Sequence, residues 1–515
     1  MPDSYIKRIL DARVYDVAIE SPIDEARRLS ARLGNRVLLK REDLQPIFSF
    51  KLRGAYNKMA GLSAAERARG VITASAGNHA QGVALAAERM KIKATIVMPR
   101  TTPEIKVQAV RSRGAKVVLH GDAYDEASAH ARKLEAEKQL CYVHPYDDPD
   151  VIAGQGTIGM EILRQVSSGL DAVFVPCGGG GLLAGVAAFI KYVRPQVKVI
   201  GVEPDDAACL YEALKANKRV VLPQVGLFAD GVAVAQIGKE TFRVIRHTVD
   251  EVITVSTDEM CAAIKDIFDD TRSIAEPAGA LALAGLKKYV ERDEVRDQTL
   301  LAIDSGANTN FDRLRHISER TEIGEKREAV FSVTIPEMPG SFRAFCGAIG
   351  RGRSITEFNY RYADAGAAHI FVGVQVAPGG GDRQMLVEDL HQKGYPVVDL
   401  TDNEMAKLHV RYMVGGHAPV EGLEEIVYRF EFPERPGALL NFLNTLDPDW
   451  NISMFHYRNH GAAFARVLVG FQVQPGARGK LAEFFARTLE ANSIYSYWDE
   501  TENPAYRLFL AESGR

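Results

Sequence analysis

The segment Ser49-Phe50-Lys51-Leu52-Arg53-Gly54 is the most informative part of the chain, because it sets a lysine between a polar loop and a predicted helix. The loop covers residues 41–46, and the helix is expected over residues 54–60. The partial positive charge of a helix N-terminus and an apolar neighbour both disfavour an ammonium group. A lysine that loses its proton easily can attack a carbonyl group. Since roughly nine lysines in ten are solvated surface charges, the rest of the chain must decide the role of Lys51.

Length and composition describe an ordinary globular protein. The chain has 515 residues, 46% hydrophobic and 25% charged, which is enough for about three or four domains. A net charge of −4 offers no basic surface for nucleic acid. The N-terminus lacks the apolar core of a secretory signal, and no run of about 18 apolar residues would span a membrane. A cytoplasmic location is therefore expected.

The cysteines argue against a disulfide framework or a metal centre. They are odd in number, dispersed and without a C-x-x-C pair. This pattern favours free thiols in a reducing compartment, so no metal is expected. The five are Cys141, Cys177, Cys209, Cys261 and Cys346.

Short β-branched segments alternate with helical patterns between residues 35 and 310. The expected strands are 37–40, 70–73, 93–97, 116–119, 172–175, 198–202, 251–255 and 299–303. The amphipathic stretches between them include 81–89, 104–113, 123–137 and 158–167. Strands separated by helices predict βαβ units and largely parallel sheets. We therefore expect an α/β fold with two lobes and a ligand between them, near the carboxyl ends of strands.

A run of four glycines, Gly178, Gly179, Gly180 and Gly181, followed by Leu182, stands between the expected strand 172–175 and a helix. Several backbone N–H groups can converge there, and the helix dipole adds to them, so the run predicts a phosphate cradle. A merely flexible turn is the weaker interpretation, because four glycines cost much conformational entropy.

The same loop leaves an alternative open. Gly179, Gly181 and Ala184 fit the dinucleotide pattern G-x-G-x-x-A. The next expected strand ends at Glu203, where a ribose-binding acid would stand. An NAD-dependent enzyme is therefore the rival interpretation.

Further polar loops follow other expected strands. Ser75-Ala76-Gly77-Asn78-His79-Ala80-Gln81-Gly82 opens a helix and can hold an anion such as a carboxylate, although helix capping by Ser75 or Asn78 is an equal alternative. Asp304-Ser305-Gly306-Ala307-Asn308 again carries a hydroxyl and a glycine. Glu276 precedes a helix, and an N-terminal cap is its expected role. A cofactor that needs both a lysine and a phosphate site is pyridoxal 5′-phosphate, whereas NAD would leave Lys51 without a function.

The chain changes character after about residue 320. Residues 319–328 are polar and predict a linker, and an internal repeat follows. The motif at 336–342 recurs at 433–439 and the motif at 354–361 recurs at 451–458, in both cases with an offset of 97 residues. Each copy predicts strand, helix, strand, strand, helix, strand, which is the ferredoxin-like order. We expect a catalytic domain over 1–320, a linker over 321–328, and repeat domains over 329–402 and 425–499.

Taken together, the lysine segment, the Ser75–Gly82 loop and the glycine run resemble the β-family (fold type II) pyridoxal-phosphate enzymes. The tandem repeat resembles paired ACT-like regulatory domains. The combination, over roughly residues 20–510, resembles the biosynthetic threonine deaminase (threonine ammonia-lyase) family. The resemblance implies a PLP-dependent lyase that converts L-threonine to 2-oxobutanoate and ammonia, with L-serine as a second substrate. It also implies feedback inhibition by isoleucine, a possible opposing effect of valine, and a homotetramer.

The resemblance also implies roles for individual residues. Lys51 would form the Schiff base, Phe50 would pack against the cofactor ring, Asn78 would bond the ring hydroxyl and Ser305 the ring nitrogen. The phosphate would be held by Gly178, Gly179, Gly180, Gly181 and Leu182. The substrate carboxylate would lie among Ser75, Asn78 and His79. The effector contacts would be Phe342, Tyr360, Leu440 and Tyr457.

Ala76 refines the expected chemistry. Related serine racemases have a second serine at this position, which acts as an acid and base on the face opposite the lysine. Without that group elimination should prevail over racemisation. Two other hypotheses stay open: an NAD-dependent oxidoreductase, and a non-catalytic amino-acid sensor, against which the intact Lys51, Asn78 and Ser305 argue.

Overall fold

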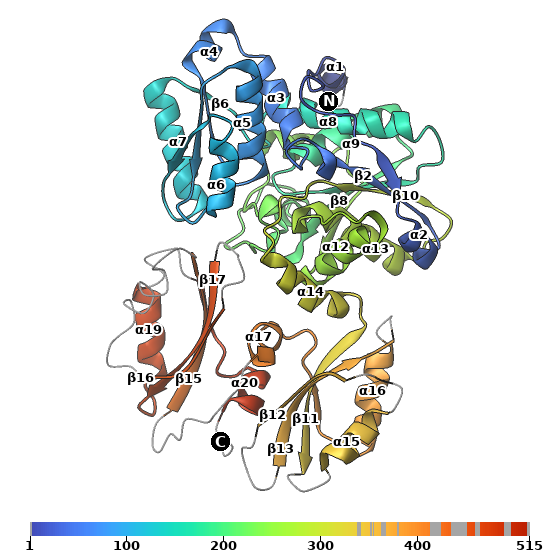
Figure 1. Ribbon diagram of the computed structural model, residues 1–515, viewed down its shortest axis with the longest axis vertical. Coiled ribbons are helices and arrows are strands. Elements are labelled where there is room, and N and C mark those ends of the chain that lie inside the picture. The colour runs from blue at the N-terminus through green and yellow to red at the C-terminus, as the bar shows by residue number, and fades with distance from the viewer. Residues whose placement is uncertain are drawn as a thin grey trace. The chain divides into compact units, whose positions relative to one another are not determined.

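The computed structural model divides the chain into two compact units, Met1–Ser318 and Glu319–Arg515, shown in Figure 1. The residues that the structure describes are 3–336, 341–350, 353, 355–361, 367–377, 381–412, 424–433, 451–458, 464–488 and 496–511.

The larger sheet of the first unit has the order β1-β2-β10-β7-β8-β9. Its strands are β1 (Ile23–Glu25), β2 (Arg36–Arg41), β7 (Ala172–Pro176), β8 (Lys198–Pro204), β9 (Glu251–Val255) and β10 (Thr299–Asp304). All neighbours pair in parallel except β1, which is antiparallel to β2. The central strands are continuous apolar runs with both faces buried, as parallel strands between helices require.

The smaller sheet is fully parallel, with the order β5-β4-β3-β6. Its strands are β3 (Val71–Ala74), β4 (Ala94–Met98), β5 (Lys116–Leu119) and β6 (Cys141–Tyr142). In Figure 1, α5, α6 and α7 surround this sheet. The two predicted lobes and all eight predicted strands are therefore confirmed, whereas β1 and β6 are too short to show any alternation in the sequence.

The helices of the first unit begin at signals that the sequence carries. Ser63 and Ser256 form capping boxes with Glu66 and Glu259, and Asp148 caps a helix that has proline in its first turn. The helices are α1 (Asp3–Leu10), α2 (Arg27–Leu33), α3 (Lys51–Ala60), α4 (Ala64–Arg69), α5 (Asn78–Met90), α6 (Glu104–Arg111), α7 (Tyr124–Lys138), α8 (Pro149–Gln165), α9 (Gly181–Val193), α10 (Cys209–Lys215), α11 (Lys239–Ile245), α12 (Thr257–Thr271), α13 (Pro277–Asp293) and α14 (Arg313–Gly324), with 3₁₀ turns η1 (Glu42–Leu44), η2 (Asp205–Ala207) and η3 (Asp230–Val232).

Helix α8 starts nine residues before the predicted stretch 158–167. Its glycines hide the helical pattern, but they are needed for packing. A Cβ on Gly154 would lie 2.7 Å from the Arg53 carbonyl oxygen of α3, and one on Gly156 would lie 3.0 Å from the Gly185 oxygen of α9. The backbone of helix α8 can therefore pack directly against the backbone of α3, the helix that begins with Lys51.

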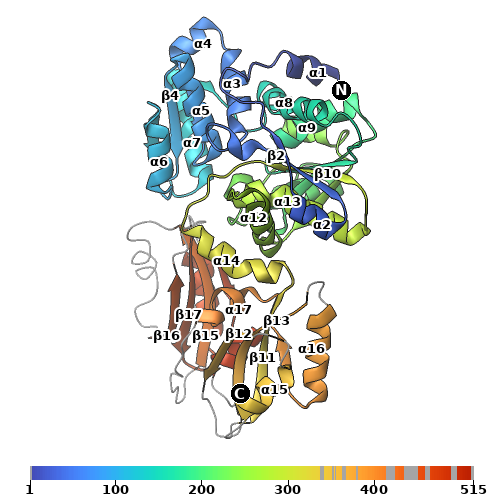
Figure 2. The ribbon, with the colours of Figure 1, turned by 45° about the vertical axis from the view of Figure 1, so that its right-hand side comes forward.

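The second unit contains two antiparallel sheets, visible in Figure 2, with the orders β12-β13-β11-β14 and β16-β17-β15-β18. The first copy consists of β11 (Glu328–Pro336), α15 (Ser341–Ile349), β12 (Ile355–Arg361), β13 (Ala367–Gln375), α16 (Gly381–Gln392) and β14 (Val397–Asp399); the second contains β15 (Glu424–Pro433), β16 (Asn451–Arg458), β17 (Phe464–Val473), α19 (Arg478–Thr488) and β18 (Ser496–Asp499). The ferredoxin-like order is confirmed in the first copy. The first of the two helices predicted for the second copy lies outside the described residues.

Each copy is extended by a short helix that the sequence pattern does not predict, α17 (Glu404–Leu408) and α20 (Pro504–Phe509), and η4 (Val410–Tyr412) follows α17. Asn403 caps α17 and Asn503 caps α20, and the Asn403 Nδ2 donates to the Asn503 Oδ1 at 3.2 Å. The Phe509 ring meets the Phe371 ring of the first copy edge-on at 5.6 Å. The added helices therefore join the two copies through a shared apolar cluster.

The predicted linker over 321–328 differs from the structure. Helix α14 continues to Gly324, and β11 begins at Glu328. Only Glu325, Lys326 and Arg327 lie between these elements. The polar composition predicted a linker, but the side chains of Ile317 and Ile323 on α14 are buried. Among the helices that the structure describes, none has the length and apolar character needed to cross a bilayer.

Candidate active site

Lys51 lies at the predicted junction, as the first residue of α3. Its half-buried side chain donates from Nζ to the Pro145 carbonyl oxygen at 3.2 Å, and Nζ is 5.2 Å from the centre of the Phe50 ring. Burial lowers the pKa of the Lys51 amine to about 8, and the negative charge of Glu276 opposes this shift. The amine is therefore far easier to deprotonate than an ordinary lysine.

This pKa makes a testable prediction about reactivity. Only the neutral amine attacks an aldehyde, so the rate of modification of Lys51 in the cofactor-free protein should rise about tenfold per pH unit and level off near pH 8. Mass spectrometry after borohydride reduction measures this rate. Lys58, on the same helix, is the control, because its ion pair with Asp148 raises its pKa. A Lys51 rate that still rises steeply above pH 9 would contradict the prediction.

The glycine run lies between β7 and α9, as predicted. Gly180 has φ +88°, and the helix closes its first turn with the bond from Ala184 N to Gly180 O, so the N–H groups of Gly181, Leu182 and Leu183 have no acceptor within the helix. A Cβ on Gly179 would lie 2.2 Å from the ring of Tyr146. The loop is thus tightly covered on one side and presents helix N–H groups, an arrangement suited to a phosphate.

The Ser75–Gly82 loop leads from β3 into α5. The Asn78 Nδ2 donates to Glu276 Oε1 at 2.5 Å, and the Asn78 Oδ1 accepts from Asn308 Nδ2 at 2.7 Å. The Ser75 Oγ accepts from Gly77 N and Ala80 N, both at 3.3 Å, so this hydroxyl supports the start of the helix.

His79 is buried, and its Nε2 lies 2.9 Å from the Val143 carbonyl oxygen. Burial, together with the charge of Lys51, lowers the pKa of His79 to about 3, so its imidazole is neutral. The side chain is therefore directed at the small lobe's own backbone, and a contact with an anion would have to come from the N–H groups of this loop.

Ser305 follows β10 and is buried. Its Oγ donates to the Ala278 carbonyl oxygen at 3.2 Å, and its own carbonyl oxygen accepts from Phe50 N at 3.3 Å. A bridge between Ser49 and Gly306 adds a second link between the two loops. Ser305 thus lies beside the segment that carries Lys51, although the two are 254 residues apart in the chain.

Three site residues were missed or misread in the sequence. Glu276 occupies the N-cap position of α13, but its side chain makes no capping hydrogen bond and points to Asn78 instead, so the expected capping role is wrong. Asn308 and Tyr146 were not singled out. Tyr146 follows the short strand β6, which has no pattern of its own in the sequence, so no sequence signal marks this residue.

The dinucleotide alternative depended on Glu203. Its carboxylate accepts from Leu210 N and Tyr211 N, both at 2.8 Å, and it is fully buried. Burial raises the pKa of Glu203 to about 7. A group that already binds the start of α10 is not available to a ribose.

The predicted effector residues are only partly described. Phe342 lies at the start of α15, Tyr360 in β12 and Tyr457 in β16, without described side chains, and Leu440 lies outside the described residues. Phe342 follows the Pro336 end of β11, which pairs with the start of β13, and Tyr360 pairs with Ile370 near that same end. The two residues therefore share one end of the first sheet.

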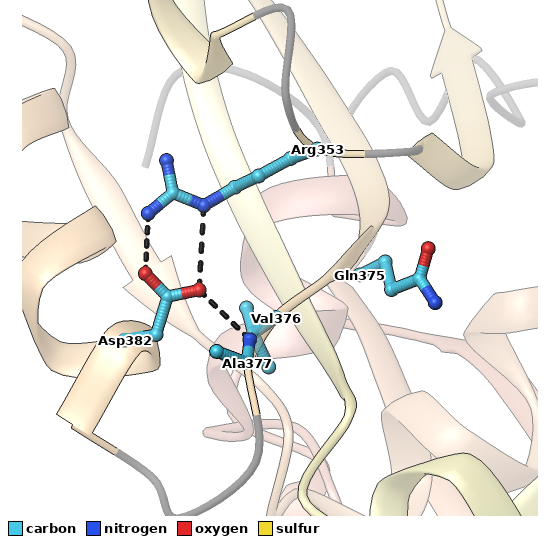
Figure 3. Close-up of a pocket in the computed structure, with 5 residues that line it drawn as sticks. All are labelled: Arg353, Gln375, Val376, Ala377 and Asp382. Atoms are coloured by element: carbon cyan, nitrogen blue, oxygen red, sulfur yellow. Dashed lines mark hydrogen bonds and ion pairs between the residues drawn. The ribbon is translucent and has the colours of Figure 1, made fainter.

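A pocket of about 460 Å³ lies at the opposite end of this sheet, where β13 passes into α16 (Figure 3). The Arg353 guanidinium pairs with the Asp382 carboxylate, which also accepts from Ala377 N at 2.9 Å. Gln375 and Val376 complete the lining. Because the charges of Arg353 and Asp382 neutralise each other, we interpret this ion pair as a structural contact that stabilises the connection between β13 and α16. At the equivalent positions the second copy has Trp450 and Gly479.

Comparison with known protein families agrees with this site. Residues 14–306 match the family model described as pyridoxal-phosphate dependent enzyme. Residues 319–410 and 416–510 match the model described as C-terminal regulatory domain of threonine dehydratase. The chain therefore belongs to the pyridoxal-phosphate dependent enzymes, with a lysine, a glycine cradle and a duplicated regulatory part.

Its relatives narrow the family further. The chain is 57% identical over 510 residues to the biosynthetic L-threonine dehydratase IlvA of Burkholderia multivorans, covering 98% of this chain and 99% of that one. It is 55% identical to the IlvA of Escherichia coli, covering 98% and 97%. The processed form of threonine deaminase isoform 2 from Solanum lycopersicum has a solved structure with 52% identity and TM-score 0.61, covering 62% of this chain and 93% of that chain. Within its class, the chain belongs to the biosynthetic threonine dehydratase family. The dinucleotide interpretation is wrong.

The residues present fit pyridoxal phosphate. The Lys51 amine has the lowered pKa that attack on an aldehyde needs, and the free N–H groups at the start of α9 suit the phosphate. The buried Ser305 hydroxyl and the second N–H of Asn78 supply neutral polar partners for the ring.

Gly179→Ala should weaken binding of the cofactor at least about tenfold, because the added Cβ would displace either the loop or the Tyr146 ring. Titration of the cofactor-free protein with pyridoxal phosphate measures the effect. Gly61→Ala is the control, since its Cβ would meet nothing closer than 3.5 Å. Equal affinity in both variants would show that the loop does not hold the phosphate.

Proposed function

We propose that this protein catalyses the dehydration and deamination of L-threonine to 2-oxobutanoate and ammonia, and of L-serine to pyruvate, as the first step of isoleucine biosynthesis. The observation that carries the proposal is Lys51, a lysine with a lowered pKa that donates to Pro145, the neighbour of the Tyr146 that packs against the glycine loop. The names of the relatives supply the substrate.

The proposed roles follow the positions of the side chains. Bound pyridoxal phosphate supplies an electron sink for charge that develops at Cα. Lys51 anchors the cofactor and then takes the Cα proton. Asn78 would hold the ring hydroxyl, and Ser305, whose hydroxyl is neutral, would hold the ring nitrogen and leave it largely unprotonated. The phosphate is held by Gly178, Gly179, Gly180, Gly181 and Leu182, with Phe50 against the ring.

The substrate carboxylate lies in the Ser75–Gly82 loop, near Ser75, Asn78 and His79. The Asn78 amide is turned to Glu276 and to the ring hydroxyl, and the one N–H of the neutral His79 ring faces the Val143 carbonyl oxygen, so the backbone N–H groups are the main donors. Ala76 offers no acid on the face opposite Lys51, so the product is released by elimination and hydrolyses to the oxo acid. Chiral chromatography of recovered substrate tests this point: accumulation of D-allothreonine from L-threonine, or of D-serine from L-serine, would contradict it.

The direct test is release of ammonia and 2-oxobutanoate from L-threonine by the purified protein. The expected result is a yellow protein with this activity, bleached by borohydride. A colourless protein that takes up no pyridoxal phosphate would overturn the proposal. Isoleucine binding without ammonia release would instead favour the amino-acid sensor.

In this proposal the regulatory part comprises residues 329–402 and 425–499. It binds isoleucine and inhibits the catalytic domain of residues 1–320. Valine is the proposed opposing effector, and the assembly is a homotetramer in the cytoplasm. The contacts are Phe342, Tyr360, Leu440 and Tyr457. Sedimentation and cell fractionation test the assembly and the location.

A chain that ends at residue 324 should keep threonine deamination and lose inhibition by isoleucine. The coupling between two sites is typically worth about 1–3 kcal/mol, so the full chain should show a response of about 5- to 150-fold. Initial rates with and without isoleucine measure it. Tyr360→Ala should weaken the response and Arg353→Ala, at the other end of the sheet, should not. If Arg353→Ala weakened the response and Tyr360→Ala did not, the effector site would be assigned to the pocket lined by Arg353.

A further inference from the structure

Asn78 is held by two side chains that come from distant parts of the chain. Asn308 follows β10, and its Nδ2 donates to two acceptors, the Ile47 carbonyl oxygen and the Asn78 Oδ1, both at 2.7 Å. Glu276 accepts from the Asn78 Nδ2 at 2.5 Å. These three side chains form a short hydrogen-bonded chain beside Lys51.

The orientation of the two amide groups follows from the Ile47 carbonyl oxygen. The carbonyl oxygen of Ile47 only accepts, so the amide nitrogen of Asn308 must face it. The same nitrogen then faces Asn78, whose oxygen must be turned toward Asn308. The Asn78 nitrogen is left facing Glu276, which takes one of its two N–H groups. The second N–H remains for a ligand, and a flipped amide would lose both bonds.

Glu276 is itself held in place by the loop after β10. Its backbone N donates to the Gly306 carbonyl oxygen at 3.0 Å. A Cβ on Gly306 would lie 2.9 Å from the Glu276 Oε1 and 3.0 Å from the Phe48 carbonyl oxygen, so glycine makes room for the carboxylate. The acid is buried and makes no capping bond to α13. Its burial is therefore unexplained by the helix.

Charged groups face Glu276 from several elements. Asp230 of η3 and Asp304 at the end of β10 are acidic, whereas Lys51, Lys106 of α6 and Arg313 of α14 are cationic. Burial, with the charge of Asp230, raises the pKa of Glu276 to about 7. In either protonation state a carboxyl oxygen can accept from Asn78, so the hydrogen bond does not depend on the charge.

We propose that Glu276 and Asn308 are positioning residues, which hold the Asn78 amide so that its second N–H points to the ring hydroxyl of the cofactor. The proposal rests on the proposed function, in which Asn78 bonds this hydroxyl. It extends that function by two residues whose effect on cofactor binding passes through Asn78. Neither acts on the substrate directly.

The test measures the dissociation constant of pyridoxal phosphate with the full-length chain. Glu276→Ala should weaken cofactor binding about 10- to 100-fold, the range for leaving a buried donor without its acceptor. Glu276→Gln should restore it to within about threefold, because a glutamine oxygen also accepts. Asn308→Asp should weaken binding as Glu276→Ala does, since a carboxylate cannot donate to the Asn78 oxygen. Glu294→Gln, at the other end of α13, is the control and should change nothing.

Combination with Asn78→Ala separates positioning from general structure. If Glu276 acts through Asn78, the double variant should bind the cofactor no more weakly than Asn78→Ala alone. Additive losses, or a Glu276→Ala variant with lower thermal stability but unchanged affinity, would overturn the inference. Unchanged affinity in Asn78→Ala would instead remove the role of Asn78, and with it the basis in the proposed function. The thermal midpoint of the cofactor-free protein is recorded for every variant.

Discussion

Replacing Lys51 by alanine is expected to lower kcat for threonine deamination by about 10⁴-fold or more, because one side chain both anchors the cofactor and removes the Cα proton. Its pKa of about 8 suits both tasks. Lys51→Arg should be just as inactive, since a guanidinium keeps the positive charge but is never neutral near pH 8. Rates of ammonia release and the visible absorption of bound cofactor are measured together.

Lys58→Ala is the matched control on the same helix. Lys58 pairs with Asp148 at 2.8 Å and has no role in the proposed chemistry, so the variant should keep most of its activity. If Lys51→Arg retained more than about one hundredth of the wild-type rate, Lys51 could not be the base, because proton transfer alone contributes at least that factor. If borohydride bleached its visible band and the cofactor then stayed attached through dialysis, another lysine would hold the cofactor.

The local features of the site were predictable, because each is a strand followed by a loop and a helix. Lys51 at the start of α3, Gly180 at the start of α9 and Asn78 at the start of α5 lie where the sequence expects them. The parallel order then brings the starts of α3 and α9 to the carboxyl end of the larger sheet. Asn78, from the smaller sheet, meets Glu276 and Asn308 of the larger lobe there. Short-range patterning and one topological rule therefore account for most of the site.

The sequence could not show which side chains form hydrogen bonds with one another in the site. Glu276 carries an ordinary N-cap pattern, and its actual partner, Asn78, is 198 residues away. The same holds for Asn308, 230 residues from Asn78. The linker prediction was wrong for a related reason: the polar stretch after residue 318 hides Ile323, whose burial depends on contacts formed only in the fold. Hydrogen bonds between distant loops leave no periodic signal.

The second large effect is expected at Arg53, two residues after Lys51. Arg53, Glu42, Glu161 and Lys40 are completely buried. Arg53 bonds both oxygens of Glu42 at 2.8 Å and both of Glu161, at 2.6 and 3.0 Å. Arg53→Met would leave two buried carboxylates with one lysine. We expect a loss of about 3–5 kcal/mol in the free energy of unfolding of the first unit.

The two tryptophans make the measurement specific. Trp450 and Trp498 both lie in the second unit, so their fluorescence in urea reports on that unit, whereas the visible band of the bound cofactor reports on the first. Arg53→Met should shift only the transition seen in the visible band of the cofactor. Arg8→Met, which removes an arginine from the exposed pair with Asp150, should shift neither measurably. Glu42→Gln added to Arg53→Met should recover part of the loss, because Lys40 still neutralises Glu161 at 2.7 Å. An Arg53→Met midpoint equal to that of Arg8→Met would mean that water reaches the cluster and that its charges need no partners to fix the start of α3.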